Sequence, residues 1–241
     1  MKKTREKKYF ILAALVIFGA GIIIGSGISS RQAIELDAER TADMILPAVD
    51  SNGNGVAGVL FTTVKPGSGR ILLDTSKILN YLDTQLSGRN AAIAASNYAK
   101  ANFSSIDIIY TIKVNASLIE GPSAGASMAL SVLLALDNKT SDGIAVTGTI
   151  TPDGSIGRVG AILEKAKAAR ASGVRLLLVP TGQSVTEQTM REKTCNTGPL
   201  EICKIAYGTR SVNIGMEAGI EVREVATLEE AYSYFIAMKA V

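Results

Sequence analysis

The chain has 241 residues, 47% of them hydrophobic, with 25 Lys and Arg, 22 Asp and Glu, two Cys and no His. This length fits one sizeable domain better than two. Without His the chain alone cannot build a Ser-His-Asp triad, a Cys-His dyad or an imidazole metal site, and two Cys are too few for a four-thiolate zinc site. We therefore expect no metal site and no cofactor.

The positive charge is concentrated at the N-terminus. Residues 1–10 hold five basic residues and one acidic residue, a net charge of +4, whereas the other 231 residues hold 20 basic and 21 acidic residues. Aromatic residues make up only 5% of the chain. A nearly neutral body with few aromatic side chains argues against a nucleic-acid partner.

An uncharged apolar run of 22 residues lies between Lys8 and Arg31. Its length matches the ~20 apolar residues of a membrane-spanning helix, and the basic flank predicts a cytoplasmic N-terminus with the remaining chain on the extracytoplasmic side. A cleaved signal peptide is the alternative, with small residues at 25–27 near the cleavage site and a secreted product. Residues 1–30 are thus predicted to be a transmembrane anchor or a signal segment, and either assignment predicts export.

The next segment, residues 31–55, is predicted to be a stalk or linker. Residues 31–46 are expected to be helical or irregular, and VDSNGNG at 49–55 is rich in turn-forming residues. The folded domain is therefore predicted to span residues 56–241.

Within that domain, predicted strands and helices alternate, which indicates a layered α/β domain. Two strands, at 56–64 and 70–73, flank the turn at 65–69, and helical spacing from 76 to 102 is interrupted at Gly88. Further strands are predicted at 106–114, 144–151, 174–179 and 220–225, and further helices at 122–136, 159–172 and 228–238. Residues 181–219 show no regular pattern.

One chemically suggestive segment, EGPSAGA at 120–126, joins a predicted strand to a predicted helix. Ser123 could simply cap the helix. The Gly and Ser residues could instead bind an anion at the helix N-terminus. A third interpretation makes Ser123 a nucleophile whose tetrahedral intermediate is stabilised by backbone N–H groups of the turn.

A second segment, ILEKAKAAR at 162–170, places Lys165 at the border of the apolar stripe of a helix, with Lys167 and Arg170 nearer the polar side. An isolated lysine at such a position usually extends its amine to solvent. Burial beside Ser123 would instead lower the pKa of the amine and make it a base near neutral pH.

Three blocks in this order resemble the proteolytic domain of Lon proteases, a Ser-Lys peptidase family: EGPSAGASMALS at 120–131, VTGTITPDGSIGRVGAILEKAKAARASG at 146–173 and LLLVP at 176–180. The resemblance covers residues 56–180 and 220–238 and is to an archaeal-like, membrane-anchored form without the ATPase module. It implies a Lon-like layered α/β domain in which Ser123 is the nucleophile, Lys165 the base, and Thr147 the residue that orients the lysine. The turn residues Gly121, Pro122 and Ala124 are then expected around the oxyanion hole.

The resemblance also implies an endopeptidase acting on peptides or unfolded protein segments, with a homo-oligomeric ring as a possible assembly. The chain departs from the family in three respects. It has no G-x-x-x-x-G-K-[ST] sequence, so ATP-driven unfolding is not expected. Glu120 stands where many relatives have Asp and either orders the loop or is an exposed turn residue, and Thr149 replaces a common Glu, which leaves the supporting role of position 149 open.

Two other classes of function remain open from the sequence. One is an inactive peptide-binding module on the same fold, against which the presence of Ser123, Lys165 and Thr147 argues. The other is a small-molecule kinase, which would need acidic Mg²⁺ ligands near the turn, where Glu120 is the one candidate.

Outside the three blocks, Cys195 and Cys203 enclose a short loop. Export favours a disulfide between them, with two free thiols as the alternative.

Overall fold

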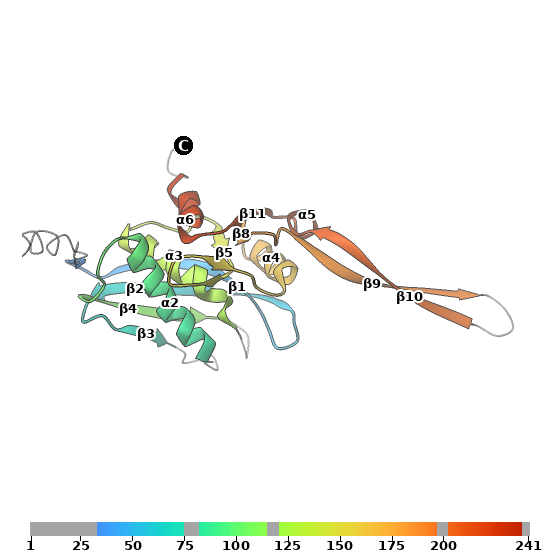
Figure 1. The fold of residues 1–241 in the computed structure, drawn as a ribbon, viewed down its shortest axis with the longest axis horizontal. Coiled ribbons are helices and arrows are strands. Elements are labelled where there is room, and N and C mark those ends of the chain that lie inside the picture. Colours follow the sequence, from blue (N-terminus) through green and yellow to red (C-terminus); the bar gives the residue numbers. More distant parts are fainter. Residues whose placement is uncertain (1–32, 75–81, 115–120, 197–201, 238–241) are drawn as a thin grey trace, which may run out of the picture. The chain divides into compact units, whose positions relative to one another are not determined.

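The computed structural model describes residues 33–74, 82–114, 121–196 and 202–237, which belong to a compact unit that starts at Ala33 (Figure 1). The predicted anchor or signal segment, residues 1–30, lies outside the described residues. Within those four ranges, no helix is long and apolar enough to cross a membrane.

A four-stranded sheet forms one layer of the unit, with the strand order β1-β2-β4-β3. Its strands are β1 (Arg40–Val49), β2 (Gly55–Pro66), β3 (Ile71–Asp74) and β4 (Ile106–Lys113). Strands β1, β2 and β4 pair antiparallel, while β3 pairs parallel with β4. The predicted strands at 56–64, 70–73 and 106–114 are therefore present.

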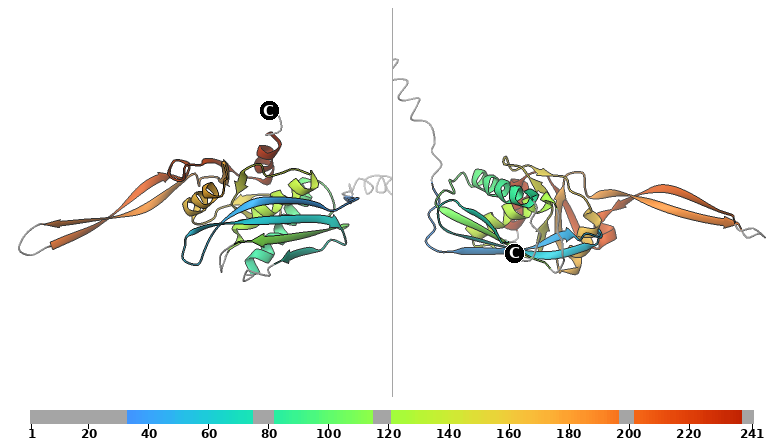
Figure 2. Two further views of the ribbon diagram at one scale, coloured as in Figure 1. Left: turned by 180° about the vertical axis from the view of Figure 1, so that it is seen from behind. Right: turned by 90° about the horizontal axis from the view of Figure 1, so that it is seen from below.

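The predicted stalk at 31–55 is wrong, because β1 is part of this sheet (Figure 2). It pairs with β2 over its whole length, from Arg40 opposite Val64 to Val49 opposite Gly55. Alternate residues of β1 are buried in the core, namely Ala42, Met44, Leu46 and Ala48. That period of two was a readable strand signal. Pro47 is compatible with the strand because β1 is an edge strand, where a missing N–H costs no ladder bond.

Helices α2 (Leu82–Tyr98) and α3 (Gly125–Leu136) pack against each other, and α3 also contacts β1 and β2. All residues of α3 except its last are buried, so this helix forms the centre of the core. The predicted break at Gly88 is wrong, because α2 runs through that position. A Cβ at Gly88 would lie 3.6 Å from the Tyr110 ring, an ordinary van der Waals distance, so the packing against β4 does not by itself require glycine at this buried position.

A second sheet of three parallel strands has the order β11-β8-β5. It consists of β5 (Ile144–Val146), β8 (Leu176–Pro180) and β11 (Glu221–Val225). One face contributes Ile144, Val146 and Leu178 to the core that contains α3 and α6 (Leu228–Ala237). The other face contributes Ala145, Leu177 and Val179 to a smaller core with α4 (Ile162–Ala171) and α5 (Ile214–Ala218). The second sheet thus separates α3 from α4.

The predicted single strand at 144–151 is divided in the structure. Strand β5 ends at Val146, and β6 (Thr149–Ile150) forms a short antiparallel pair with β7 (Ile156–Gly157). The interruption falls on Thr147 and Gly148, where the chain leaves the second sheet.

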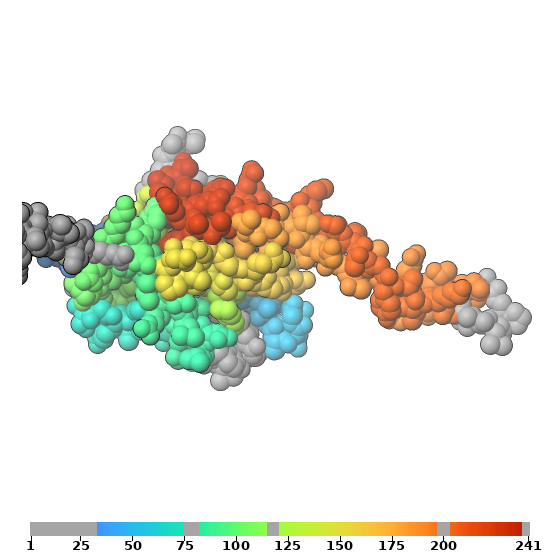
Figure 3. Space-filling view, in the orientation of Figure 1, coloured from blue at the N-terminus to red at the C-terminus, as the bar shows by residue number. Residues whose placement is uncertain are grey.

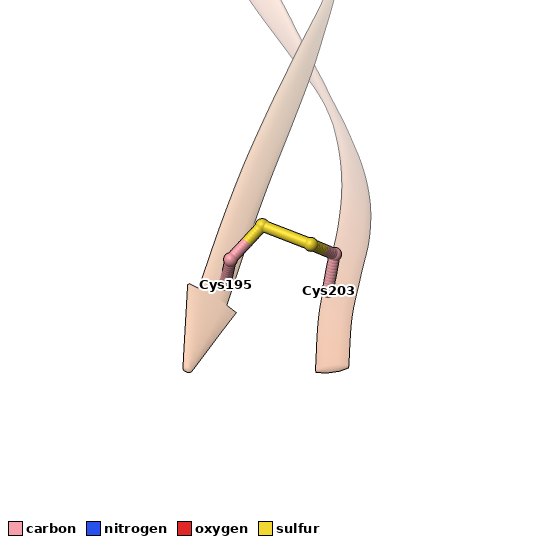
Figure 4. Close-up of a disulfide and its surroundings, with 2 residues drawn as sticks. All are labelled: Cys195 and Cys203. Carbon is pink, nitrogen blue, oxygen red and sulfur yellow. A yellow bond between two sulfur atoms is a disulfide. The ribbon is translucent and has the colours of Figure 1, made fainter. Parts of the chain in front are cut away.

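Between β8 and α5, the residues expected to be irregular contain a long antiparallel hairpin of β9 (Val185–Asn196) and β10 (Ile202–Asn213). We call these two strands the arm. It projects from the remainder of the unit, and most of its described side chains are exposed (Figures 1 and 3). Cys195 and Cys203 are directly opposite in the register and are joined by a disulfide near the distal end (Figure 4).

Candidate active site

Ser123 lies in a single 3₁₀ turn, η1 (Pro122–Ala124), which leads directly into α3. Gly121 precedes the turn with φ 97°, a backbone conformation that a side chain would strain. Pro122 occupies the first helical position, where its missing N–H costs no hydrogen bond. Ser123 is half-buried and Ala124 is buried. The sequence therefore places a partly accessible hydroxyl at the start of a buried helix.

Backbone hydrogen bonds attach this turn to the segment that follows β5. The Gly148 N–H donates to the Ser123 carbonyl at 3.1 Å, and the Ala126 N–H donates to the Gly148 carbonyl at 3.1 Å. Gly125 allows this approach, because a Cβ there would lie 2.8 Å from the Ile150 side chain. The Ser127 hydroxyl adds a hydrogen bond of 2.8 Å to the carbonyl of Val146 at the end of β5. The position of Ser123 relative to Thr147 is thus set by main-chain contacts.

Thr147 continues the line of β5, since its N–H donates to the Leu178 carbonyl of β8 at 3.0 Å. Side chains alternate between the faces of a strand, and Ala145 faces α4. Thr147 therefore lies on the α4 side of the second sheet. Its side chain is buried, and its hydroxyl has no hydrogen-bond partner among the described residues.

Lys165 occupies the second turn of α4 and is only 3% exposed, whereas Lys167 and Arg170 on the same helix are exposed. The alternative of an amine extended to solvent therefore does not hold for Lys165. No hydrogen bond or ion pair to its amine is present in the described part of the chain. Burial lowers the pKa of the Lys165 amine from 10.5 to about 8, because a low-dielectric environment penalises the charged form.

The structure thus brings Ser123 beside the Thr147-Gly148 segment and buries Lys165 in the helix that packs on the Thr147 side of the second sheet. Thr147 was expected to orient the lysine, but no hydrogen bond between them is formed here, since the threonine hydroxyl has no partner among the residues that the structure describes. Glu120 lies outside the described residues. The sequence analysis did not predict the backbone hydrogen bonds of Gly148 or the hydrogen bond from Ser127 to Val146. For the Gly148 contacts, the Thr147-Gly148 pair was the available signal in the sequence.

In the described ranges of the chain, no three His, Cys, Asp or Glu side chains are grouped so that they could hold a metal ion. The arrangement offers instead a hydroxyl, a largely dehydrated amine and the amides of a helix start. These are the components of acyl transfer to a serine without imidazole.

Residues 82–196 match the family model of the Lon protease (S16) C-terminal proteolytic domain. Over 167 residues, 67% of this chain and 20% of the relative, the chain is 31% identical to a Lon protease of Phenylobacterium zucineum (strain HLK1). Over 145 residues, 56% of this chain and 18% of the relative, it is 33% identical to a Lon protease of Roseiflexus castenholzii (strain DSM 13941 / HLO8). The chain thus spans about a fifth of the length of these relatives.

Proposed function

We propose that this protein is a serine endopeptidase in which Ser123 is the nucleophile and Lys165 the general base. The observation that carries the proposal is the buried Lys165 amine with a lowered pKa, in a chain that has no His to act as base. The match of residues 82–196 to the Lon proteolytic domain supports the same chemistry.

In the proposed reaction the Ser123 oxygen attacks the peptide carbonyl carbon while its proton moves to the neutral Lys165 amine. The negative oxygen of the tetrahedral intermediate is stabilised by N–H groups at the helix start around Gly121 and Ala124; Pro122, which has no N–H, shapes the turn. The lysine then returns the proton to the leaving nitrogen as the peptide bond breaks. Water then attacks the acyl-serine while its proton moves to the Lys165 amine, and the lysine passes this proton to the Ser123 oxygen as the ester bond breaks and the acid product leaves.

Thr147 is proposed to accept or donate a hydrogen bond to the lysine amine once substrate is bound. Its buried hydroxyl is free to do so, since it has no other partner among the described residues. Glu120, next to the turn in sequence, is proposed to order the loop.

We further propose that the reaction needs no ATP, because the 241 residues contain no G-x-x-x-x-G-K-[ST] sequence and no step above uses a nucleotide. The substrates would be peptides or unfolded protein segments, and a homo-oligomeric ring is the proposed assembly.

The apolar run before Arg31 supports a membrane anchor at residues 1–30 with the catalytic domain on the extracytoplasmic side. Protease protection of the body in sealed vesicles tests this orientation.

The activity is tested with fluorescently labelled casein, with and without ATP, on wild type, Lys165→Arg and Lys167→Arg. Arginine keeps the charge but does not deprotonate in proteins, so Lys165→Arg is expected to lower kcat by at least about 10²-fold. Lys167→Arg, on the exposed side of the same helix, is expected to be close to wild type. Equal activity of wild type and Lys165→Arg would rule out the mechanism, and binding of casein without cleavage would favour the inactive peptide-binding module.

A further inference from the structure

A short turn at the root of the arm lies against the segment that leads into α4. The turn comprises residues 181–184, between β8 and β9. Its Gln183 side chain is 9% exposed and forms two hydrogen bonds with the backbone of one residue, Val159. The Val159 N–H donates to Gln183 Oε1 at 3.0 Å, and Gln183 Nε2 donates to the Val159 carbonyl at 2.8 Å. The side-chain amide thus pairs with Val159 as a neighbouring strand would.

The turn that carries Gln183 is itself anchored to the second sheet. The Glu224 carboxylate of β11 accepts hydrogen bonds from the Gly182 N–H at 2.9 Å and the Ser184 N–H at 2.8 Å. The pKa of Glu224 is lowered to about 2 by the Ser184 side chain and by these amides, so the carboxylate is ionised at any working pH. The Thr181 N–H also bonds the Val225 carbonyl. The Gln183 side chain therefore extends from a backbone turn that hydrogen bonds hold against β11.

The helix start that follows Val159 lacks the usual means of fixing its own position. No side chain caps the first turn of α4. Ala161 at the cap position has φ 54°, a left-handed conformation. This conformation costs a non-glycine residue free energy and persists only where the surrounding structure maintains it. The Lys165 N–H bonds the carbonyl of this same residue at 3.1 Å. The turn of helix that carries Lys165 is consequently attached to a strained residue two positions after Val159, the residue that Gln183 holds.

We propose that Gln183 is a positioning residue for Lys165: by fixing Val159 it holds the start of α4 in place and so sets how deeply the lysine amine is buried. The same turn begins the arm, so the arm and the lysine helix share one anchor. The inference rests on the proposed function only for the role of the amine as base. Its effect on the titration of that amine does not depend on catalysis.

The test compares wild type with Gln183→Met, Gln183→Glu and the control Gln188→Met. Methionine keeps the length of the side chain and removes both hydrogen bonds, while glutamate keeps the acceptor for the Val159 N–H and loses the donor to its carbonyl. Gln188 is a half-buried glutamine in β9 of the arm, outside the turn that holds Val159. It therefore controls for loss of a glutamine near the same turn.

The primary measurement is the pH dependence of Lys165 acetylation by acetic anhydride, read by mass spectrometry with Lys167 as the exposed reference in the same peptide. Only the neutral amine reacts. In Gln183→Met the amine is expected to become more hydrated and to titrate at least about one pH unit higher, which is about tenfold lower reactivity at pH 7.5. Gln183→Glu is expected to lie between wild type and methionine, and Gln188→Met to match wild type.

With casein at pH 7.5, Gln183→Met is expected to lower kcat about tenfold with KM unchanged, and to shift the pH profile upward by the same amount as the acetylation curve. A lower unfolding temperature with an unshifted Lys165 titration would show a merely structural role and overturn the inference. If Gln183→Met does not fold, Gln183→Glu is judged by the same criterion. A shifted titration in a protein without peptidase activity would refute the proposed function and leave the positioning role standing.

Discussion

At the scale of single residues, burial of the Lys165 amine lowers the stability of the folded protein and supports the proposed chemistry. Its side chain is buried in α4, and the pKa of its amine is lowered to about 8 by that burial. Below this pH the amine is mostly charged, and the folded protein bears the free-energy cost of burying that charge. The neutral form, which the proposed reaction requires, becomes abundant only above it.

The pH dependence of activity follows from this titration. With Lys165 as base, kcat/KM is expected to rise about tenfold per pH unit below about pH 8 and to level off above it, because only the neutral amine accepts the serine proton. Casein cleavage measured across this range in buffers of constant ionic strength gives the profile. Activity that is already constant from pH 5 upward would argue against a lysine base.

The pH dependence of stability follows as well. Lys165→Met keeps an apolar side chain of similar length, so at pH 6.5 it is expected to raise the free energy of unfolding by up to about 3 kcal/mol, the equivalent of a pKa lowered from 10.5 to about 8. Below pH 8 the Lys165 amine is protonated in both the folded and the unfolded protein, and the folded protein bears the whole free-energy cost of burying the charged amine. The unfolded state holds the extra proton between the two pKa values, so wild-type stability rises there and the difference between the proteins disappears near pH 10.5.

Urea unfolding at pH 6.5 and pH 10.5 measures this difference, with Lys167→Met as the exposed control. Equal stabilities of wild type and Lys165→Met at pH 6.5 would show that the amine is hydrated in solution.

At the scale of elements, the arm is a two-stranded ribbon with few contacts outside its root. Isolated two-stranded hairpins are at best marginally stable in water, so a covalent link at the distal end has a clear physical role. Cys195 and Cys203 close a short loop between opposite positions of β9 and β10. Chain entropy assigns such a loop about 2–3 kcal/mol, less than a long loop would gain.

Reduction of this disulfide is expected to increase amide hydrogen exchange in β9 and β10 without changing exchange in β5 or β8 and without loss of casein cleavage. The reason is that the root of the arm is held separately, by Glu224 and by the pairing of Gln183 with Val159. Hydrogen exchange with mass spectrometry, before and after reduction and on a Cys195→Ser/Cys203→Ser variant, measures this. Exchange that increases equally in β8 would show that the arm and the second sheet unfold together.

At the scale of the whole molecule, the position of β1 decides where the folding unit begins. Met44 is fully buried and Leu46 is 2% exposed, and burial of each such side chain contributes roughly 1.5–3 kcal/mol. Together with Ala42 and Ala48, their removal would cost a large part of the ~5–15 kcal/mol that stabilises a typical domain. Loss of β1 would also expose the pairing edge of β2.

A chain starting at Ala33 is therefore expected to unfold cooperatively, and a chain starting at Val56 is expected not to fold. Circular dichroism and thermal unfolding of the two purified chains distinguish them. A cooperative transition in the shorter chain would show that the sheet does not depend on β1.

The sequence by itself determined the alternation of strands and helices, the Gly-Pro-Ser turn at a helix start and the exclusion of imidazole chemistry, because these depend on local residue order and composition. It held a signal for β1 in the alternation of Ala42, Met44, Leu46 and Ala48, but the charged residues before this segment and the turn-forming residues at 49–55 after it led to the prediction of a stalk. Nor did it reveal that α2 continues through Gly88, because glycine lowers helix propensity locally, whereas the packing of α2 against α3 exists only in the folded core.

The environment of Lys165 was decided by tertiary structure alone. On a helix viewed in isolation, Lys165 borders the apolar stripe and could extend its amine to water. Packing of α4 against β1, β2 and β8 buries the side chain, and only then does desolvation lower the pKa of its amine. The pairing of Gln183 with Val159 joins residues 24 positions apart in the sequence, so no local pattern could indicate it. Spacing along the chain specifies which side chains are available, whereas burial and partners arise only when distant segments pack together.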